Sequence, residues 1–291
     1  MNEIARIEQT LEAVIERATA ADCPPLLAGA VHHAVFPGGA RIRPRLCLAV
    51  AAACAEDIPD LTDAAASAIE LLHCASLIHD DLPCFDDADM RRGKASVHIA
   101  YGEPCAVLAG DAMIIMAFEL LGRQIQSSLE PRRVAEIIRI ISGSVGMPRG
   151  ITAGQAWELE PTTGLVDYQR AKTGSLFAAS TEAGAAAAGF ECSQWRMLGE
   201  CLGEAYQVAD DIRDVASTVE EIGKPIGQDA IHGRPSAVAQ LGMDGAKARL
   251  KRLVGEAMAS IPDCPGRDEL RIEIAHQSQR FIPKELMLAV A

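Results

Sequence analysis

Two clusters of aspartates constrain this chain more than any other feature. Residues 80–86 read DDLPCFD and are followed by RRGK at 91–94, while residues 207–214 read QVADDIRD. Carboxylates packed this densely among apolar neighbours repel one another, and a hard, oxygen-seeking cation such as Mg²⁺ relieves that repulsion. The fold is therefore expected to bring acidic side chains around divalent cations.

The hydrophobic pattern is helical nearly everywhere. Ile7, Leu11 and Val14 recur at three- and four-residue spacing, and so do Val134 and Ile137. Alanine-rich stretches at 49–55 and 183–188 favour helices that approach each other closely. Alternating β-branched runs and Asn-Gly hairpin turns are missing from the sequence. The pattern predicts an all-α fold, a large helical bundle around a central cavity.

Length and composition favour one large domain. With 291 residues and 49% hydrophobic content, the chain can bury a sizeable core. The stretches with Pro and Gly near 148–150, 161–164 and 223–225 are short, and helical patterns resume after each. We predict a single domain over residues 1–291.

Charge and cysteine usage narrow the partners and the compartment. A net charge of −13 argues against binding to a nucleic acid. Nine cysteines without a C-x-x-C pair indicate a reducing, cytoplasmic setting. The N-terminus lacks the pattern of a signal peptide, and we expect no transmembrane segment.

Both aspartate clusters are expected to lie on helices. Gln207, Asp210, Asp211 and Asp214 fall at i, i+3, i+4 and i+7, which places them on one face of a helix. Such a stripe is costly on an inward face unless a cation or ligand compensates it. A second helix is expected to start near residue 62 or 63 and to reach residue 80, with Pro83 ending it.

These segments resemble the trans-polyprenyl diphosphate synthases. Residues 80–94 are similar to the family's first aspartate-rich motif, and residues 207–214 to its second. Residues 38–44 (GGARIRP) resemble the G-G-K-R-x-R-P motif, and residues 172–174 (KTG) the K-T-G element. The four matches follow the family's order and spacing between about residues 30 and 240.

The resemblance implies a type I isoprenoid-synthase fold and a Mg²⁺-dependent, head-to-tail prenyl transfer, usually by a homodimer. Isopentenyl diphosphate condenses with an allylic diphosphate, farnesyl diphosphate or shorter, by ionisation, condensation and elimination. Three Mg²⁺ ions per site are expected on the carboxylates of Asp80, Asp81, Asp86, Asp210, Asp211 and Asp214. The residues implied in catalysis are Asp80, Asp86, Asp210 and Lys172.

The resemblance also implies how the two diphosphates are held. The positions that match the isopentenyl diphosphate side are Arg43, His73 and Arg92. Those that match the allylic side are Arg91, Lys172, Thr173, Gln207, Lys224 and Arg234. One departure is Ala40, which stands where the family usually has lysine. Either isopentenyl diphosphate binds more weakly as a result, or Arg41 substitutes for that lysine.

Product length in the family depends on side chains below the first motif. The usual gate is the fifth residue before Asp80, here the small Ala75, with Ser76 next to it. The helix that carries Leu108, Ala112, Met113 and Met116 is expected to form the floor of the pocket. The C20 product geranylgeranyl diphosphate is favoured over C15 farnesyl diphosphate. The local sequence is similar to members that serve bacterial carotenoid biosynthesis.

Other classes of protein stay open at this point. The E-x-x-H pairs Glu70/His73 and Glu273/His276 have the spacing of di-iron ligands in helical bundles. A terpene cyclase shares the first acidic motif, but Asp214 stands where its second motif has a hydroxyl residue. A regulatory subunit without catalysis is a further alternative, and so is a synthase that stops at C15.

Overall fold

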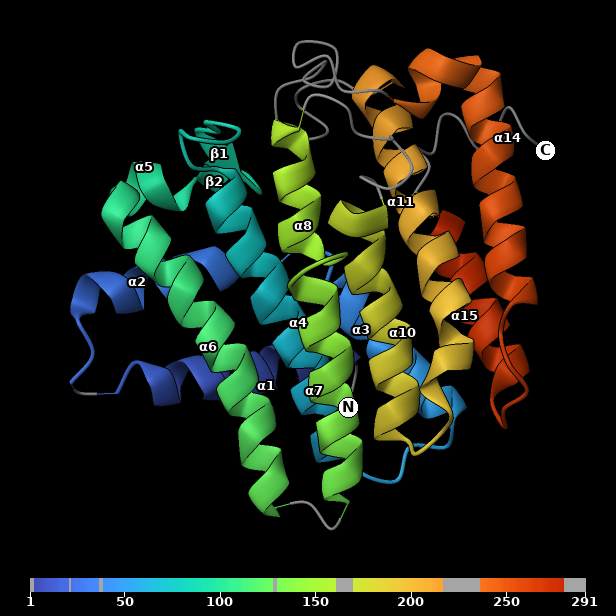
Figure 1. Cartoon of the computed structure of the whole chain (residues 1–291), viewed down its shortest axis with the longest axis horizontal. Coiled ribbons are helices and arrows are strands. Elements are labelled where there is room, and N and C mark those ends of the chain that lie inside the picture. Colours follow the sequence, from blue (N-terminus) through green and yellow to red (C-terminus); the bar gives the residue numbers. More distant parts are fainter. Residues whose placement is uncertain are drawn as a thin grey trace. The chain divides into compact units, whose positions relative to one another are not determined.

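Most of the described residues are helical, which confirms the predicted all-α fold (Figure 1). The computed structural model describes residues 3–20, 22–36, 39–127, 130–160, 170–216 and 236–279. Two compact units can be distinguished: unit 1 comprises residues 1–141 and 183–190, and unit 2 comprises residues 142–182 and 191–291. The single domain over residues 1–291 stays a prediction.

Unit 1 contains the N-terminal helices and a small hairpin. Its helices and strands are α1 (Glu3–Ala18), α2 (Pro25–Val35), α3 (Ile42–Ala53), α4 (Pro59–Asp80), β1 (Met90–Arg91), β2 (Lys94–Ala95), α5 (Val97–Tyr101), α6 (Glu103–Ser127), most of α7 (Pro131–Val145) and the last residues of α10 (Ser175–Ala187). The apolar stripe predicted for α1 is confirmed, because Ile7, Leu11 and Val14 are all buried.

Helix α4 is buried on nearly every side and packs along α6. It begins at Pro59, three residues before the predicted start, because proline fits the first helical turn, where its missing N–H costs nothing. It ends at Asp80, before Leu82 and Pro83, as expected from the clash between a proline ring and a helical residue before it. Glu70 lies among the buried residues of α4 and needs a partner there.

The β1–β2 hairpin was not predicted. Met90 pairs with Ala95 and Arg91 with Lys94. The two turn residues, Arg92 and Gly93, have φ of 53° and 76°, the left-handed conformation of a tight hairpin turn. Glycine adopts it freely, whereas arginine pays roughly 1 kcal/mol or more in steric strain.

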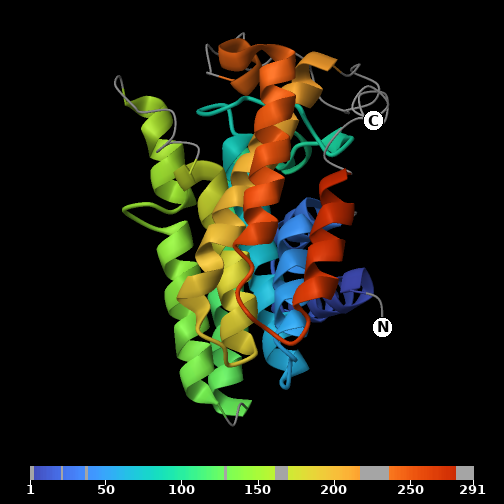
Figure 2. The same ribbon diagram turned by 90° about the vertical axis from the view of Figure 1, so that its right-hand side faces the viewer.

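Unit 2 has helices of more varied type. It comprises α8 (Ile151–Ala156), the 3₁₀-helix η1 (Trp157–Leu159), the π-helix η2 (Arg170–Gly174), most of α10, the 3₁₀-helix η3 (Cys192–Trp195), α11 (Arg196–Ala216), α14 (Ala237–Ala259) and α15 (Arg267–Gln279). Helices α11 and α14 run side by side (Figure 2). Alongside α11, the N-terminus of α14 lies within reach of the second aspartate cluster.

Two described helices are long and apolar enough to cross a membrane by length and composition alone, α4 and residues 103–126 of α6. The share of the apolar window that is buried is 78% in α4 and 44% in α6. This is weak evidence for a membrane span, since core helices of soluble proteins pass the same test.

The packing of α10 on α3 within unit 1 gives a test of stability. A Cβ atom at Gly184 would lie 2.4 Å from the carbonyl oxygen of Cys47, whereas a Cβ at Gly122 of α6 would meet nothing within 4 Å. We expect Gly184→Ala to lower the free energy of unfolding by about 1–3 kcal/mol through overpacking. Gly122→Ala should raise it by up to about 1 kcal/mol through helix propensity. Chemical denaturation followed by circular dichroism measures both, and equal stability of the two variants would contradict this packing.

Candidate active site

The first aspartate cluster is shaped by a loop that folds back on the end of α4. The backbone N–H of Asp86 donates to the carbonyl of Asp80 at 2.9 Å, and that of Ala88 donates to the carbonyl of Asp81 at 3.2 Å. This turn brings carboxylate oxygens of Asp80 and Asp86 within 4.8 Å of each other. Both side chains are half-buried. Two oxygen donors this close fit a Mg²⁺ ion, which prefers carboxylates and neutralises their repulsion.

Asp81 lies in a different environment from its two neighbours in the cluster. It is only 2% exposed, and Arg91 Nε donates to its Oδ1 at 2.9 Å and to its Oδ2 at 3.2 Å. Burial raises the pKa of Asp81 even though the guanidinium of Arg91 acts in the opposite direction. The structure therefore joins two predicted site residues in an ion pair, and a metal-binding role of Asp81 stays a prediction.

Arg43 and His73 are brought together, as the sequence predicted for one diphosphate site. Arg43 Nη1 lies 3.3 Å from His73 Nε2. A guanidinium can only donate, so Nε2 accepts and the ring proton is assigned to Nδ1. Burial lowers the pKa of His73 well below its ordinary value, and the positive charges of Arg43 and Arg92 lower it further. His73 is therefore neutral at physiological pH.

Arg92 lies against the glycine motif. A Cβ atom at Gly39 would lie 2.9 Å from Arg92 Nε, so only glycine allows this approach. Arg92 also contacts Cys74 on α4, with 3.9 Å between Nη1 and Sγ. The three residues predicted for isopentenyl diphosphate, Arg43, His73 and Arg92, thus belong to one region of unit 1.

Arg41 is held inside unit 1. Its guanidinium donates to Glu8 at 2.8 Å, to Glu70 at 2.6 Å and to the carbonyl of Val35 at 2.9 Å. The side chain is 1% exposed. These bonds give Arg41 a structural role and argue against its replacing the lysine missing at position 40. They also argue against the di-iron alternative, because the Glu70 carboxylate binds a guanidinium.

In unit 2, Lys172 is held by a residue that the sequence reasoning missed. Its Nζ lies 2.7 Å from Glu158 Oε1, and Gln155 Nε2 donates to Glu158 Oε2 at 2.9 Å. A Cβ atom at Gly154 would lie 2.4 Å from the backbone nitrogen of Lys172, so α8 and η2 touch through a glycine. The signal available in the sequence was the Gly154-Gln155-x-x-Glu158 spacing, a polar pair three residues apart on one helical face.

The second aspartate cluster is joined to the K-T-G element. Thr173 Oγ1 donates to Gln207 Oε1 at 3.1 Å, and Gln207 Nε2 donates to Asp211 Oδ1 at 3.0 Å. Asp211 is 2% exposed, and its Oδ2 accepts the backbone N–H of Ala237 at 2.6 Å, at the start of α14. Asp210 accepts from Arg213 at 3.0 Å.

The remaining predicted site residues lie on α11, α4 and α6 or outside the described residues. Asp214 is half-buried on α11, Ala75 is buried on α4, and Ser76 donates to the carbonyl of His73 at 2.7 Å. Ala112 is half-buried on α6. Lys224 and Arg234 lie outside the described residues.

The predicted pocket floor needs one correction. Met113 and Met116 are buried, but the side chain of Leu108 is 57% exposed and lies on the outer face of α6. Leu108 therefore does not close the interior of unit 1. Leu108 and Ile115 are seven residues apart, almost two helical turns, and both lie on one exposed face of α6.

Comparison with known proteins decides the family. The sequence profile named polyprenyl synthetase matches residues 24–265. The chain belongs to the polyprenyl synthetase family. It is 51% identical to a geranylgeranyl diphosphate synthase of Cereibacter sphaeroides over 98% of both chains, and 49% identical to one of Rhodobacter capsulatus over 91% of both. A solved apo structure of an FPP/GFPP synthase from Zymomonas mobilis is 29% identical, with a TM-score of 0.79 over 95% of this chain and 99% of that one.

Family membership confirms the resemblance seen in the sequence motifs and the isoprenoid-synthase fold. It also confirms the enzyme class, which is that of a prenyltransferase. The polyprenyl synthetase family depends on Mg²⁺ and uses isopentenyl and allylic diphosphates. The acidic pair Asp80 and Asp86 fits that requirement.

The neutral state of His73 gives a pH-dependent prediction. Because its folded pKa lies well below the ordinary value of 6.5, the unfolded chain takes up a proton that the folded protein does not. Above pH 6.5 His73 leaves stability unaffected, and stability falls as pH drops from 6.5 toward the folded pKa. NMR of the imidazole, assigned with His73→Gln, should show His73 still neutral at pH 6. A ring that titrates at its ordinary pKa would contradict the arrangement.

Proposed function

We propose that the protein condenses isopentenyl diphosphate with farnesyl diphosphate or a shorter allylic diphosphate and releases geranylgeranyl diphosphate. The observation that carries this proposal is the identity of 51% over 98% of the chain to a geranylgeranyl diphosphate synthase. The cationic region around Arg43, His73 and Arg92 beside two close carboxylates is what a diphosphate substrate requires, because forked guanidinium groups match phosphate oxygens.

The reaction needs no protein nucleophile. The bond between the allylic carbon and its diphosphate oxygen breaks, and the electron pair leaves with the diphosphate. The double bond of isopentenyl diphosphate attacks the resulting carbocation, and the proton lost afterwards goes to the released diphosphate. Arg43, Arg92 and the neutral His73 hold isopentenyl diphosphate, and the allylic diphosphate is assigned to Arg91, Lys172, Thr173, Gln207, Lys224 and Arg234.

The carboxylates that we assign to Mg²⁺ are Asp80, Asp81 and Asp86 of the first cluster and Asp210, Asp211 and Asp214 of the second, with three ions in total. Bound Mg²⁺ neutralises the negative charge that develops on the leaving diphosphate. Asp80, Asp86 and Asp210 are half-buried, so their oxygens lie near the protein surface rather than deep inside it.

A C20 product follows from the small side chains near the first motif. Ala75 is 1% exposed and lies about one and a half turns before Asp80 on α4. Ala75, Ser76 and Ala112, the residues assigned to chain length, all have side chains much smaller than an aromatic one. Farnesyl diphosphate as the final C15 product is the alternative outcome.

Turnover with defined substrates tests the function. Purified protein with isopentenyl and farnesyl diphosphates and Mg²⁺ should form C20 product, and chelation by EDTA should abolish it. Ala75→Tyr, supplied with geranyl diphosphate, should stop at C15, because the ring fills the space next to the growing chain. Chromatography of the dephosphorylated products measures both results.

The same assay separates the alternatives. A wild type that stops at C15 contradicts the proposed product but leaves the enzyme class standing. Hydrocarbon released without isopentenyl diphosphate identifies a terpene cyclase. A folded protein without any turnover identifies a regulatory subunit.

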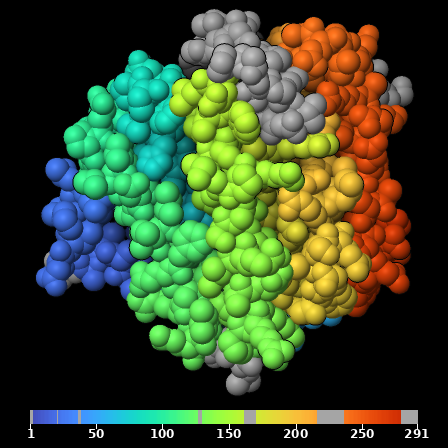
Figure 3. All heavy atoms as spheres, in the orientation of Figure 1, coloured from blue at the N-terminus to red at the C-terminus, as the bar shows by residue number. Residues whose placement is uncertain are grey.

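We also propose a cytoplasmic homodimer that supplies carotenoid biosynthesis. The exposed face of α6 supports the dimer, and part of α6 is visible in the space-filling view (Figure 3). Leu108 is 57%, Ile115 68% and Val107 41% exposed, an unusual row of large apolar side chains for a free surface. A second copy that covers this row would remove it from water.

The oligomeric state is tested by light scattering after size exclusion. The wild type should have twice the chain mass of 30.9 kDa, and Leu108→Glu with Ile115→Glu should shift it to a monomer, because burying two carboxylates is costly. Ile272→Glu is the matched control, since Ile272 is 70% exposed on α15 in unit 2. A monomeric wild type, or a dimer that survives the double substitution, would contradict this interface.

A further inference from the structure

Glu70 is a buried carboxylate next to the residues assigned to isopentenyl diphosphate. Its side chain is 2% exposed, and its Oε1 lies 2.6 Å from Arg41 Nη1 and 3.8 Å from Arg92 Nη2. It precedes His73 by three residues on α4, almost one helical turn. A charge buried this deeply persists only when it is paired, so its two arginines are part of one arrangement.

We propose that Glu70 is a positioning residue for isopentenyl diphosphate binding, acting through Arg92 and through Arg41 on the segment that carries Arg43. The inference rests on the proposed function, because it assumes that Arg43 and Arg92 grip a diphosphate. Glu70 itself does not touch the substrate.

The arginines around His73 repel one another. Four arginines, at positions 41, 43, 91 and 92, are close enough to lower the pKa of His73. Guanidinium groups gathered for an anion repel one another until it binds, and that repulsion tends to spread them apart. Buried acids on α4 counter it: Glu70 pairs with Arg41 and Arg92, and Asp81 pairs with Arg91.

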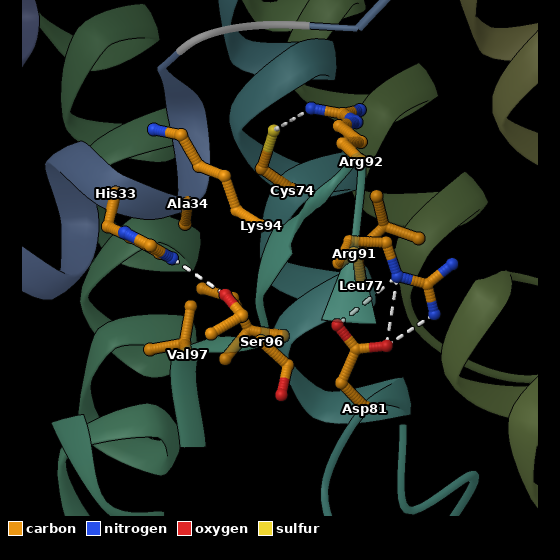
Figure 4. A pocket seen from close by; sticks show the side chains of 12 residues that line it. His33, Ala34, Cys74, Leu77, Asp81, Arg91, Arg92, Lys94, Ser96 and Val97 are labelled. Carbon is orange, nitrogen blue, oxygen red and sulfur yellow. Dashed lines mark hydrogen bonds and ion pairs between the residues drawn. The ribbon is translucent and has the colours of Figure 1, made fainter. Parts of the chain in front are cut away.

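Glu70 and Asp81 also hold the hairpin in place. They are eleven residues apart, about three turns, and Asp81 is the C-cap residue of α4, so both lie on one face of this helix. The hairpin that carries Arg91 and Arg92 is held over this face at two points, with the two arginine side chains diverging (Figure 4). Arg92 has a φ of 53°, a strained conformation for a residue with a side chain. Contacts to α4 and to Gly39 offset that strain and fix the direction of the guanidinium.

Cys74 completes the link between Glu70 and Arg92. Its Sγ lies 3.8 Å from Glu70 Oε1 and 3.9 Å from Arg92 Nη1. Burial raises the pKa of the Cys74 thiol to about 12, and the nearby Glu70 adds to the rise. The thiol therefore stays protonated and can donate to the carboxylate while its sulfur accepts from Arg92.

Glu70 also anchors the segment before α3 through Arg41. Arg41 has a φ of 49° and immediately precedes Ile42, the first residue of α3. Its bonds to Glu70 and to Glu8 of α1 hold this left-handed residue in place. Arg43 follows two residues later in the first turn of α3, so the orientation of its backbone depends on that anchor.

The test is steady-state kinetics on Glu70→Gln, which keeps the shape of the side chain and removes its charge. We expect KM for isopentenyl diphosphate to rise roughly tenfold, with KM for the allylic diphosphate changed less than about twofold. In an Arg92→Gln background the same substitution should raise KM by a smaller factor, because only the effect that Glu70 exerts through Arg41 remains. Glu70→Asp, which keeps the charge on a shorter stem, should give an intermediate KM.

Asp63→Asn is the matched control. Asp63 also joins α4 to α1, through an ion pair of 2.8 Å with Arg6, but it lies away from the assigned site residues. It should lower the melting temperature and leave KM for isopentenyl diphosphate unchanged.

These measurements distinguish a positioning role of Glu70 from a merely structural one. If Glu70→Gln lowers the melting temperature but leaves KM for isopentenyl diphosphate unchanged, Glu70 is merely structural and the inference is wrong. If Glu70→Gln does not fold, Glu70→Asp decides alone: a raised KM supports the inference and an unchanged one overturns it. A wild type without prenyl transfer contradicts the proposed function instead.

Discussion

Pairing of buried charge on α4 is the constraint on which unit 1 depends. The helix is buried on nearly every side, yet it carries Glu70 within its length and Asp81 at its C-terminal end, both almost fully buried. Each acid binds an arginine that lies outside the helix, which ties the segment before α3 and the β1–β2 hairpin to α4. A buried, densely charged region of this kind strongly favours one arrangement of its side chains, because any displaced partner leaves an uncompensated charge. The cationic region beside Asp80 therefore has a fixed framework.

Close backbone approach is the second constraint, and glycine supplies it. Gly39 lets the Arg92 guanidinium lie against the chain, and Gly154 lets α8 touch the backbone of Lys172. In both places a single methyl group would push apart the residues assigned to diphosphate binding. Gly39 of the GGARIRP motif thus acts through close packing against Arg92 rather than through turn geometry. This links a sequence motif to the placement of a side chain more than fifty residues away.

Local sequence predicted the helices well and the pairings poorly. The stripe of Ile7, Leu11 and Val14 depends only on neighbours within two turns, so it could be read directly. Arg41 and Glu70 are 29 residues apart, and Asp211 and Ala237 are 26 apart, so spacing gave no sign of either bond. The hairpin was not predicted because its turn contains Arg92 at a position where asparagine or glycine is usual. Leu108 was misplaced because apolar character alone does not say which face of α6 is covered.

The two aspartate clusters, organised in different units, share a division of roles that their sequences conceal. In each adjacent pair the second aspartate is 2% exposed and bound by the protein itself: Asp81 by Arg91, and Asp211 by Gln207 and the start of α14. The carboxylates that stay half-buried are Asp80 and Asp86 in one cluster, and Asp210 and Asp214 in the other. An acid held by protein donors fixes the backbone beside it and so orients the neighbouring aspartate. In each cluster a doubled aspartate therefore places a deeply buried, protein-bound acid next to a more accessible one.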